Sequence, residues 1–315
     1  VATGILFSEN TFSLNDPDRD YATKLSTYGD THTSIRKITP TNTDFSTIFI
    51  SISPPLDFVF MDEQGRRTGF DPVTQEVVQE IPGALYSFLA PLTDDNKTGA
   101  TNGDGATQLD FNLPAEGEYM LQIHEPEETE EYNLAFYVLG KDADAVFVED
   151  SNTATPDFGQ TYSINYFPGE PFPAKVDLIV DIDIKPESAT NPINCSNSNG
   201  IIPLAILSDD GFDATTIDPN TVRFGPLGVE EFHRNKDGSA RQHLEDVDND
   251  GDLDLVLHFT LGGSGLTCED VVVGLSGTTF TGLGISGSDN VRMIEGGWFF
   301  LSSVLNWINH WALFR

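Results

Sequence analysis

The chain has few positive charges. It carries 16 Lys and Arg against 50 Asp and Glu, which gives a formal net charge of −34 at pH 7. Such an acidic chain repels the phosphates of nucleic acids and of anionic membranes, and it attracts divalent cations. We therefore expect no nucleic-acid partner and look for oxygen ligands that bind a cation.

Cysteine is also scarce, since Cys195 and Cys268 are the only two in the sequence. No C-x-x-C motif or Cys/His cluster offers a metal or redox role for them. A single disulfide between them is predicted, closing a loop of roughly 70 residues with a stabilisation of about 4 kcal/mol on the chain-entropy model.

Motifs for catalysis are absent. There is no G-x-S-x-G, no H-E-x-x-H and no phosphate loop, and no G-x-G-x-x-G stands between a strand and a helix. The 6 His are scattered along the sequence, and His258 is expected to pack rather than react. Carboxylates are too abundant to single out an acid/base pair. We predict that the protein is not an enzyme; an accessory protein of a glycoside hydrolase is a secondary alternative.

The sequence lacks a long uninterrupted apolar run. The best candidate is the Trp-rich tail, residues 296–315, but Asn306, Asn309 and His310 interrupt it, and a membrane-spanning helix needs about 20 apolar residues. No membrane span is predicted. Three readings of the tail stay open: a helix that docks on a neighbouring subunit, a surface anchor, or a wrongly determined end of the sequence.

Strand signals dominate what is present. From Ser46 onwards apolar residues alternate, as at Ile48, Ile50 and Ile52, and turn residues separate the runs. We predict an all-β fold with two tandem antiparallel β-sandwiches, Ig-like or jelly-roll-like. The predicted divisions are an apolar arm (1–15), a first sandwich (16–167), a Pro-rich linker (168–175), a second sandwich (176–295) and the tail (296–315).

The most specific motif is a D-x-D-x-D-G-x-x-D loop that leads into an alternating strand. Gly251 stands at the sharpest bend, and Leu257 takes the position at which an EF-hand has a bidentate Glu. The loop therefore precedes a strand and not a helix. Ca²⁺ is the predicted cofactor, with ligands from the side chains of Asp246, Asp248, Asp250 and Asp254 and from the carbonyl of Asp252.

A second cation site is a weaker candidate. Its acidic and amide residues flank a loop of small residues but lack a fixed ligand spacing, so a solvated flexible loop is the competing interpretation. The residues are Asp94, Asp95, Asn96, Asn102 and Asp104.

Two segments resemble β-sandwich modules of secreted and cell-surface proteins. Residues 46–139 carry Gly65-Arg-Arg-Thr-Gly69-Phe-Asp71-Pro and resemble a bacterial binding or spacer module. Residues 176–294 carry Val180-Asp-Ile-Asp-Ile-Lys185-Pro186 and Val222-Arg-Phe-Gly-Pro226, and are similar to a module that often ends secreted bacterial and archaeal proteins. The resemblance implies a β-sandwich with a Ca²⁺ site at the loop and supplies no catalytic residue.

The start of the chain suggests a compartment. It opens at Val1, without Met or a charged segment before an apolar core, so either a signal peptide has been removed or the sequence begins late; a secreted, mature protein is the expectation. Extracellular or cell-surface localisation also fits the disulfide. Sequons at Asn96 and Asn194 are possible glycosylation sites.

The N-terminal arm predicts self-assembly. A polar stretch, residues 15–44, follows the apolar arm, whose assembly residues are Ile5, Leu6, Phe7, Phe12 and Leu14. If the arm pairs with the sheet edge of the next subunit, a head-to-tail filament results; alternatively it is the first strand of its own domain. The expected function is a calcium-stabilised, non-enzymatic subunit of a surface fibril or layer. The alternative is a calcium-dependent adhesin that binds surface glycans.

Overall fold

The computed structural model describes residues 44–89, 92–93, 101–102, 105–156, 159–186 and 188–295. Nearly all regular structure in these ranges is β-strand, which confirms the all-β prediction. The predicted arm (1–15) and tail (296–315) lie outside the described residues.

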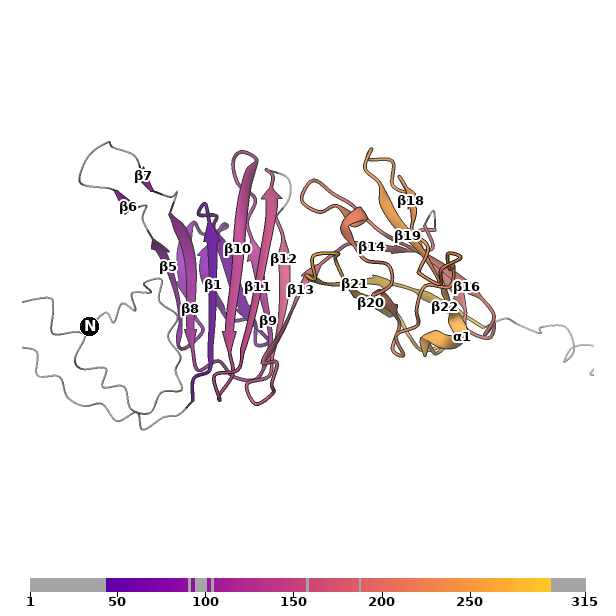
Figure 1. The fold of residues 1–315 in the computed structure, drawn as a ribbon, viewed down its shortest axis with the longest axis horizontal. Coiled ribbons are helices and arrows are strands. Elements are labelled where there is room, and N and C mark those ends of the chain that lie inside the picture. The colour runs from indigo at the N-terminus through magenta and orange to yellow at the C-terminus, as the bar shows by residue number, and fades with distance from the viewer. Residues whose placement is uncertain are drawn as a thin grey trace, which may run out of the picture. The chain divides into compact units, whose positions relative to one another are not determined.

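The first sheet has five antiparallel strands (Figure 1). Their order is β11 (Ala145–Ala154), β10 (Glu130–Leu139), β1 (Thr47–Ser53), β8 (Ala106–Asn112) and β5 (Ala84–Leu89). Alternation places Ile48, Ile50 and Ile52 of β1 on the inner face, where all three are fully buried.

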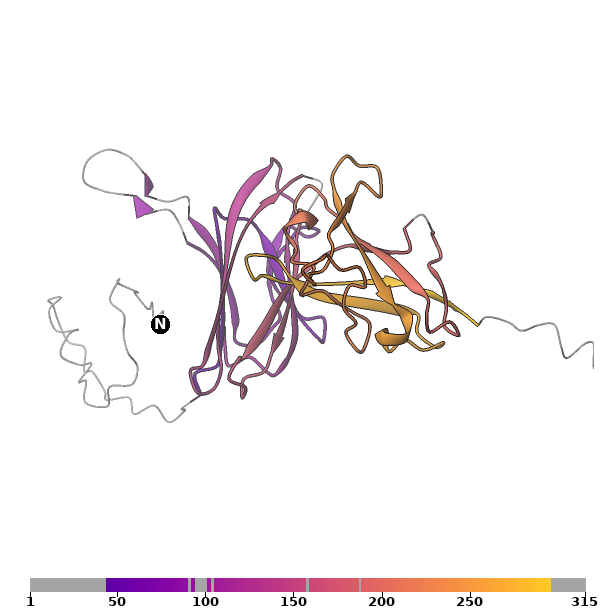
Figure 2. The same cartoon turned by 45° about the vertical axis from the view of Figure 1, so that its right-hand side comes forward.

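A nine-stranded sheet supplies the second layer of this sandwich, and the turned view separates the two layers (Figure 2). Its order is β17 (Arg223–Phe224), β20 (Val272–Thr278), β21 (Gly284–Asn290), β13 (Ala174–Ile179), β12 (Thr161–Tyr166), β9 (Gly117–Ile123), β2 (Phe58–Asp62), β3 (Arg67–Asp71) and β4 (Glu76–Gln79). Aromatic pairs join the layers: the ring centroids of Phe58 and Tyr86 are 5.0 Å apart, and those of Phe136 and Tyr162 are 5.6 Å apart.

The Pro-rich segment 168–175, predicted to be an extended linker, instead contains the turn between β12 and β13 and the first residues of β13. Phe167 N–H donates to the carbonyl of Pro173 at 2.7 Å and closes this turn. Strand β13 then pairs antiparallel with β12 and parallel with β21. The sheet therefore continues across the predicted boundary, because Pro residues can shape a tight turn as well as stiffen a linker.

A four-stranded sheet packs on the β17-β20-β21 end of the long sheet. Its order is β14 (Ile182–Ile184), β16 (Ile201–Ile206), β19 (Asp254–Thr260) and β18 (His243–Glu245). Leu255, Leu257 and Phe259 of β19 point into this core and are fully buried, and Phe259 stacks on Phe224 with 4.9 Å between ring centroids. The remaining elements are short: β15 (Pro192–Asn194) pairs with β22 (Arg292–Ile294), β6 (Leu92–Thr93) pairs with β7 (Thr101–Asn102), and η3 (Ala214–Thr216) and α1 (Leu261–Ser264) are single turns.

The predicted disulfide is confirmed. Cys195 and Cys268 are bonded with their Cα atoms 5.3 Å apart, within the range that the bond requires. It joins the segment after β15 to the loop before β20. Within the described ranges, no helix has the length and apolar character needed to cross a membrane.

Candidate metal centre

The predicted calcium loop connects β18 and β19, which pair as an antiparallel hairpin. Glu245 lies opposite Asp254, so residues 246–253 form the connection. Two loop residues have left-handed backbone conformations, with φ of 67° at Asn249 and 108° at Gly251. Asn and Gly tolerate this region best, which explains why the chain can turn sharply here.

Three of the predicted ligands converge. One carboxylate oxygen from each of Asp246, Asp248 and Asp254 lies within 4.8 Å of the others. Asp246 and Asp248 are exposed, whereas Asp254 is fully buried at the start of β19. Three carboxylates around one point form a donor set for a hard divalent cation.

Backbone hydrogen bonds hold Asp254 in place. Its Oδ1 accepts from the N–H of Ser208 and its Oδ2 from the N–H of Val247, each at 2.8 Å. One bond therefore anchors the loop to the segment after β16, and the other anchors the loop to its own first turn. Desolvation and the charges of Asp250 and Asp254 raise the pKa of Asp248, so the concentrated negative charge favours a cation.

The side chain of Asp250, also a predicted ligand, is exposed and does not belong to the group of three carboxylates. Asp252, which is predicted to bind through its carbonyl, is exposed as well. Asp250 N–H donates to Oδ1 of Asp248 at 3.2 Å, and Asp252 N–H donates to Oδ1 of Asp250 at 2.9 Å. The side chains of Asp248 and Asp250 therefore cap successive turns of the loop backbone, as Asp commonly does.

Few residues of the remaining predicted sites lie within the described ranges. Asp94, Asp95, Asn96 and Asp104 lie outside the described residues, as do Ile5, Leu6, Phe7, Phe12 and Leu14; Asn102 falls in β7, but its side chain is not described. The Asn194 sequon lies at the end of β15, where Asn194 is exposed and its Oδ1 accepts from the N–H of Ser196 at 3.1 Å.

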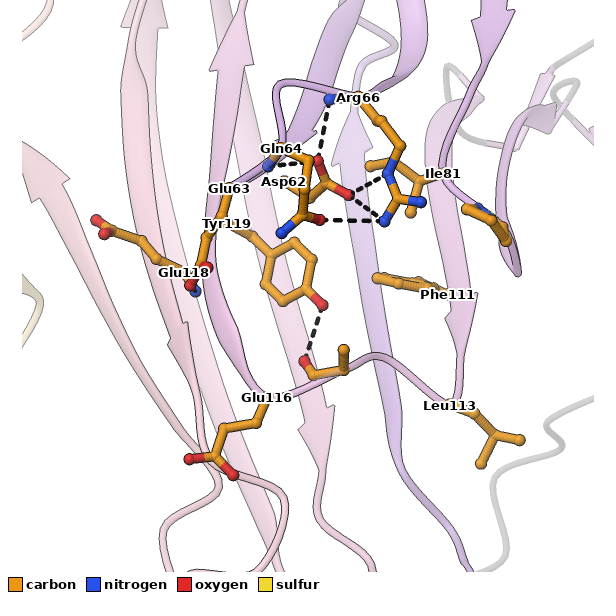
Figure 3. Close-up of a pocket in the computed structure, with 12 residues that line it drawn as sticks. Asp62, Glu63, Gln64, Arg66, Ile81, Phe111, Leu113, Glu116, Glu118 and Tyr119 are labelled. Carbon is orange, nitrogen blue, oxygen red and sulfur yellow. Dashed lines mark hydrogen bonds and ion pairs between the residues drawn. The ribbon is translucent and has the colours of Figure 1, made fainter.

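A pocket in the first sandwich does not suit a substrate. Its polar lining includes Arg66, whose guanidinium is 2.6 Å from Oδ2 of Asp62, and the hydroxyl of Tyr119, which donates to the carbonyl of Ala115 at 2.8 Å (Figure 3). The guanidinium and the hydroxyl therefore already have partners within the chain. The pocket volume is about 170 Å³, whereas small-molecule sites usually measure about 300–1,000 Å³.

No protein-family model and no curated protein sequence matches this chain. The class that the structure defines is therefore an all-β protein with one disulfide and an acidic loop that could hold a metal ion.

One cluster of metal-binding side chains is not predicted by the sequence. The His residues are scattered along it and His258 is expected to pack, but the structure brings His233, His243 and His258 together. A signal existed for two of them: the loop pairs Glu245 with Asp254, so His243 lies opposite Val256 and His258 follows two residues later on the same face. His233 comes from a loop, and nothing in the sequence pattern places it beside the hairpin.

Proposed function

We propose that this chain is a non-enzymatic, calcium-stabilised structural protein of the extracellular surface. The observation that carries the proposal is the convergence of Asp246, Asp248 and Asp254 on a loop that joins two strands. A cation there cross-links the loop and neutralises its charge, and Ca²⁺ fits because it takes carboxylate oxygens in flexible geometry. The disulfide supports an oxidising compartment, and so does the resemblance of residues 176–294 to modules of secreted proteins.

Calcium binding is tested by thermal unfolding of the full chain after chelation. The melting temperature should rise on addition of millimolar Ca²⁺ and rise much less with equal Mg²⁺, because Mg²⁺ demands a smaller, octahedral set of oxygens. A melting temperature that does not respond to Ca²⁺ would show that the acidic loop is a solvated turn.

We further propose that copies assemble by strand donation from the N-terminal arm. Among the described strands, β11 forms one end of the five-stranded sheet and pairs with β10 alone. It is ten residues long, and Phe147 in its centre is 57% exposed. A long edge strand of this kind is a template for another strand, and residues 2–14 supply an apolar one.

Assembly is tested by sedimentation and electron microscopy of the full chain, a chain lacking residues 1–14, and Phe147→Lys. Both variants should lose polymers, because one removes the donor strand and the other places a charge on the acceptor edge. The matched control is Phe172→Lys, which charges an exposed Phe in the β12–β13 turn and should polymerise normally. Polymers of the truncated chain would refute strand donation.

A second candidate function, glycan binding by an adhesin, is favoured by one surface feature. Phe49, Tyr137 and Phe147 are cross-strand neighbours on the outer face of the first sheet, and Tyr137 and Phe147 are 42% and 57% exposed. Rings aligned across three strands present a flat apolar surface, on which sugar rings can stack. Tyr137→Ala should abolish binding to immobilised polysaccharide and leave polymers intact; binding equal to that of the parent chain would remove this candidate.

A further inference from the structure

The strands on either side of the acidic loop carry a second group of metal-binding side chains. His243 lies in β18, His258 lies in β19, and His233 lies in the loop between β17 and β18. One ring nitrogen of each is within 4.8 Å of the others, and the centroids of the His233 and His258 rings are 4.4 Å apart.

Each of the three rings has one buried nitrogen without a hydrogen-bond partner. These atoms are Nδ1 of His233, Nε2 of His243 and Nδ1 of His258. Buried polar atoms are almost always paired, and each unpaired one costs about 1–3 kcal/mol. Three such atoms in one cluster indicate a missing common partner, because rings that only packed together would donate N–H groups to one another.

A buried carboxylate fixes the backbone that carries two of these rings. Oε1 of Glu231 accepts from the N–H of His233 at 2.7 Å, and Oε2 accepts from the N–H of His258. The same Oε1 is 3.7 Å from Nδ1 of His233. The Glu231 side chain is fully buried, and among the described residues no Lys or Arg forms an ion pair with it. A cation beside His233 would balance this charge.

We propose that His233, His243 and His258 form a binding site for a divalent transition-metal ion of the Zn²⁺ type, with Glu231 as the positioning residue. Imidazole nitrogens suit Zn²⁺, Co²⁺, Ni²⁺ and Cu²⁺, whereas Ca²⁺ takes oxygen ligands, so this site differs in chemistry from the acidic loop. Zn–N bonds of about 2.0–2.1 Å in a tetrahedral site place ligand nitrogens roughly 3.3 Å apart. Small side-chain rotations would bring the present cluster to that spacing.

The exposed ring of His233 gives an ion access to the site, and the number of protein ligands leaves one position open. The His233 side chain is 40% exposed, so an ion can reach the cluster from solvent without opening the core. Three protein nitrogens leave the fourth position of a tetrahedral ion free for water or for a ligand group from outside the chain. The site is therefore suited to bind an external donor group as well as the ion.

The test uses the full chain, stripped of metal by chelation and titrated with Zn²⁺ by calorimetry and with Co²⁺ by visible absorption. The parent chain should bind one ion with tetrahedral Co²⁺ absorption. His243→Gln and His258→Gln should each weaken Zn²⁺ binding at least tenfold. Two controls should bind like the parent: His124→Gln, which changes a His whose Nε2 contacts the Phe70 carbonyl at 2.8 Å, and Asp248→Asn, which changes the acidic loop.

A second measurement covers variants that do not fold. Zn²⁺ should protect His233, His243 and His258 of the parent chain from chemical modification, read by mass spectrometry, and should leave the modification of His124 unchanged. Absence of Zn²⁺ binding by the parent chain, or tight binding that survives loss of both His243 and His258, would overturn the proposal. Neither result bears on calcium binding by the acidic loop, so the two sites can fail independently.

Discussion

Substituting a buried and an exposed carboxylate of the acidic loop distinguishes the contribution of this loop to folding from the proposed binding of an ion. Asp254 is fully buried and accepts two backbone hydrogen bonds, from Ser208 and Val247. Asp248 is exposed and accepts one, from the next turn of the loop. We compare Asp254→Asn with Asp248→Asn, since both remove one negative charge and keep the side-chain shape.

The expected magnitudes differ in the absence of metal. An Asn at 254 can accept from only one of the two N–H groups and turns its NH₂ toward the other, so the free energy of unfolding should fall by about 1–3 kcal/mol in chelator. An Asn at 248 breaks no buried hydrogen bond and relieves repulsion from neighbouring carboxylates. Its effect in chelator should therefore stay within about 0.5 kcal/mol.

In the presence of calcium, Asp248→Asn should no longer be neutral for the free energy of unfolding. With a dissociation constant of about 10⁻⁴ M, 10 mM Ca²⁺ stabilises the parent chain by about 2.7 kcal/mol. Both variants should lose most of this increment, so urea unfolding should place the parent with Ca²⁺ highest, the parent in chelator and Asp248→Asn in either condition together below it, and Asp254→Asn lowest. If Asp248→Asn keeps the full calcium increment, the ion does not bind in this loop and the reasoning fails.

Three further predictions concern stability. Replacing both Cys195 and Cys268 by Ser should lower the free energy of unfolding by about 2–5 kcal/mol, measured against the parent in urea, with an unchanged curve as the contrary result. Gly69→Ala should strongly lower the melting temperature, because a Cβ would lie 2.2 Å from the carbonyl oxygen of Phe58 and φ there is 142°. The matched control is Gly65→Ala, at a position with φ of 74° and open space around it, and it should lower the melting temperature less. Burial, with the charges of Asp181 and Asp210, raises the pKa of Asp209 to about 6, so the folded state binds the extra proton and this group's contribution to stability is lost as pH rises from about 4 to 6. Asp209→Asn keeps the acceptor for Gly211 N–H and should raise stability at pH 7.5 by about 1 kcal/mol, after allowance for partial exposure, but not at pH 4; equal effects at both pH values would contradict this.

Local patterns predicted the strands well. The alternation of Ile48, Ile50 and Ile52 gives both the strand and its buried face, because side chains of a strand alternate strictly between faces. The loop motif likewise predicted the turn and three converging carboxylates. Each of these features depends on residues close together in the sequence.

Features that depend on distant segments were not predictable in this way. The pairing of β12 with β13 turns the predicted linker into a hairpin, and the parallel pairing of β13 with β21 joins residues about a hundred positions apart. The burial of Asp254 depends on Ser208, 46 residues away. No local pattern records such contacts, and the Pro-rich turn has the same composition as a linker.

The β18–β19 hairpin contributes to both proposed ion sites. The loop joins strands in which Glu245 pairs with Asp254. This register places His243 opposite Val256 and therefore on the same face of the sheet as His258. A slip by one residue would send the ring of His258 to the opposite face of the sheet. A hard cation bound in the loop would therefore stabilise the register that the proposed imidazole site requires. If both proposed sites bind ions, an ion on the three His residues would stabilise the loop in return, because coupling between binding sites is reciprocal.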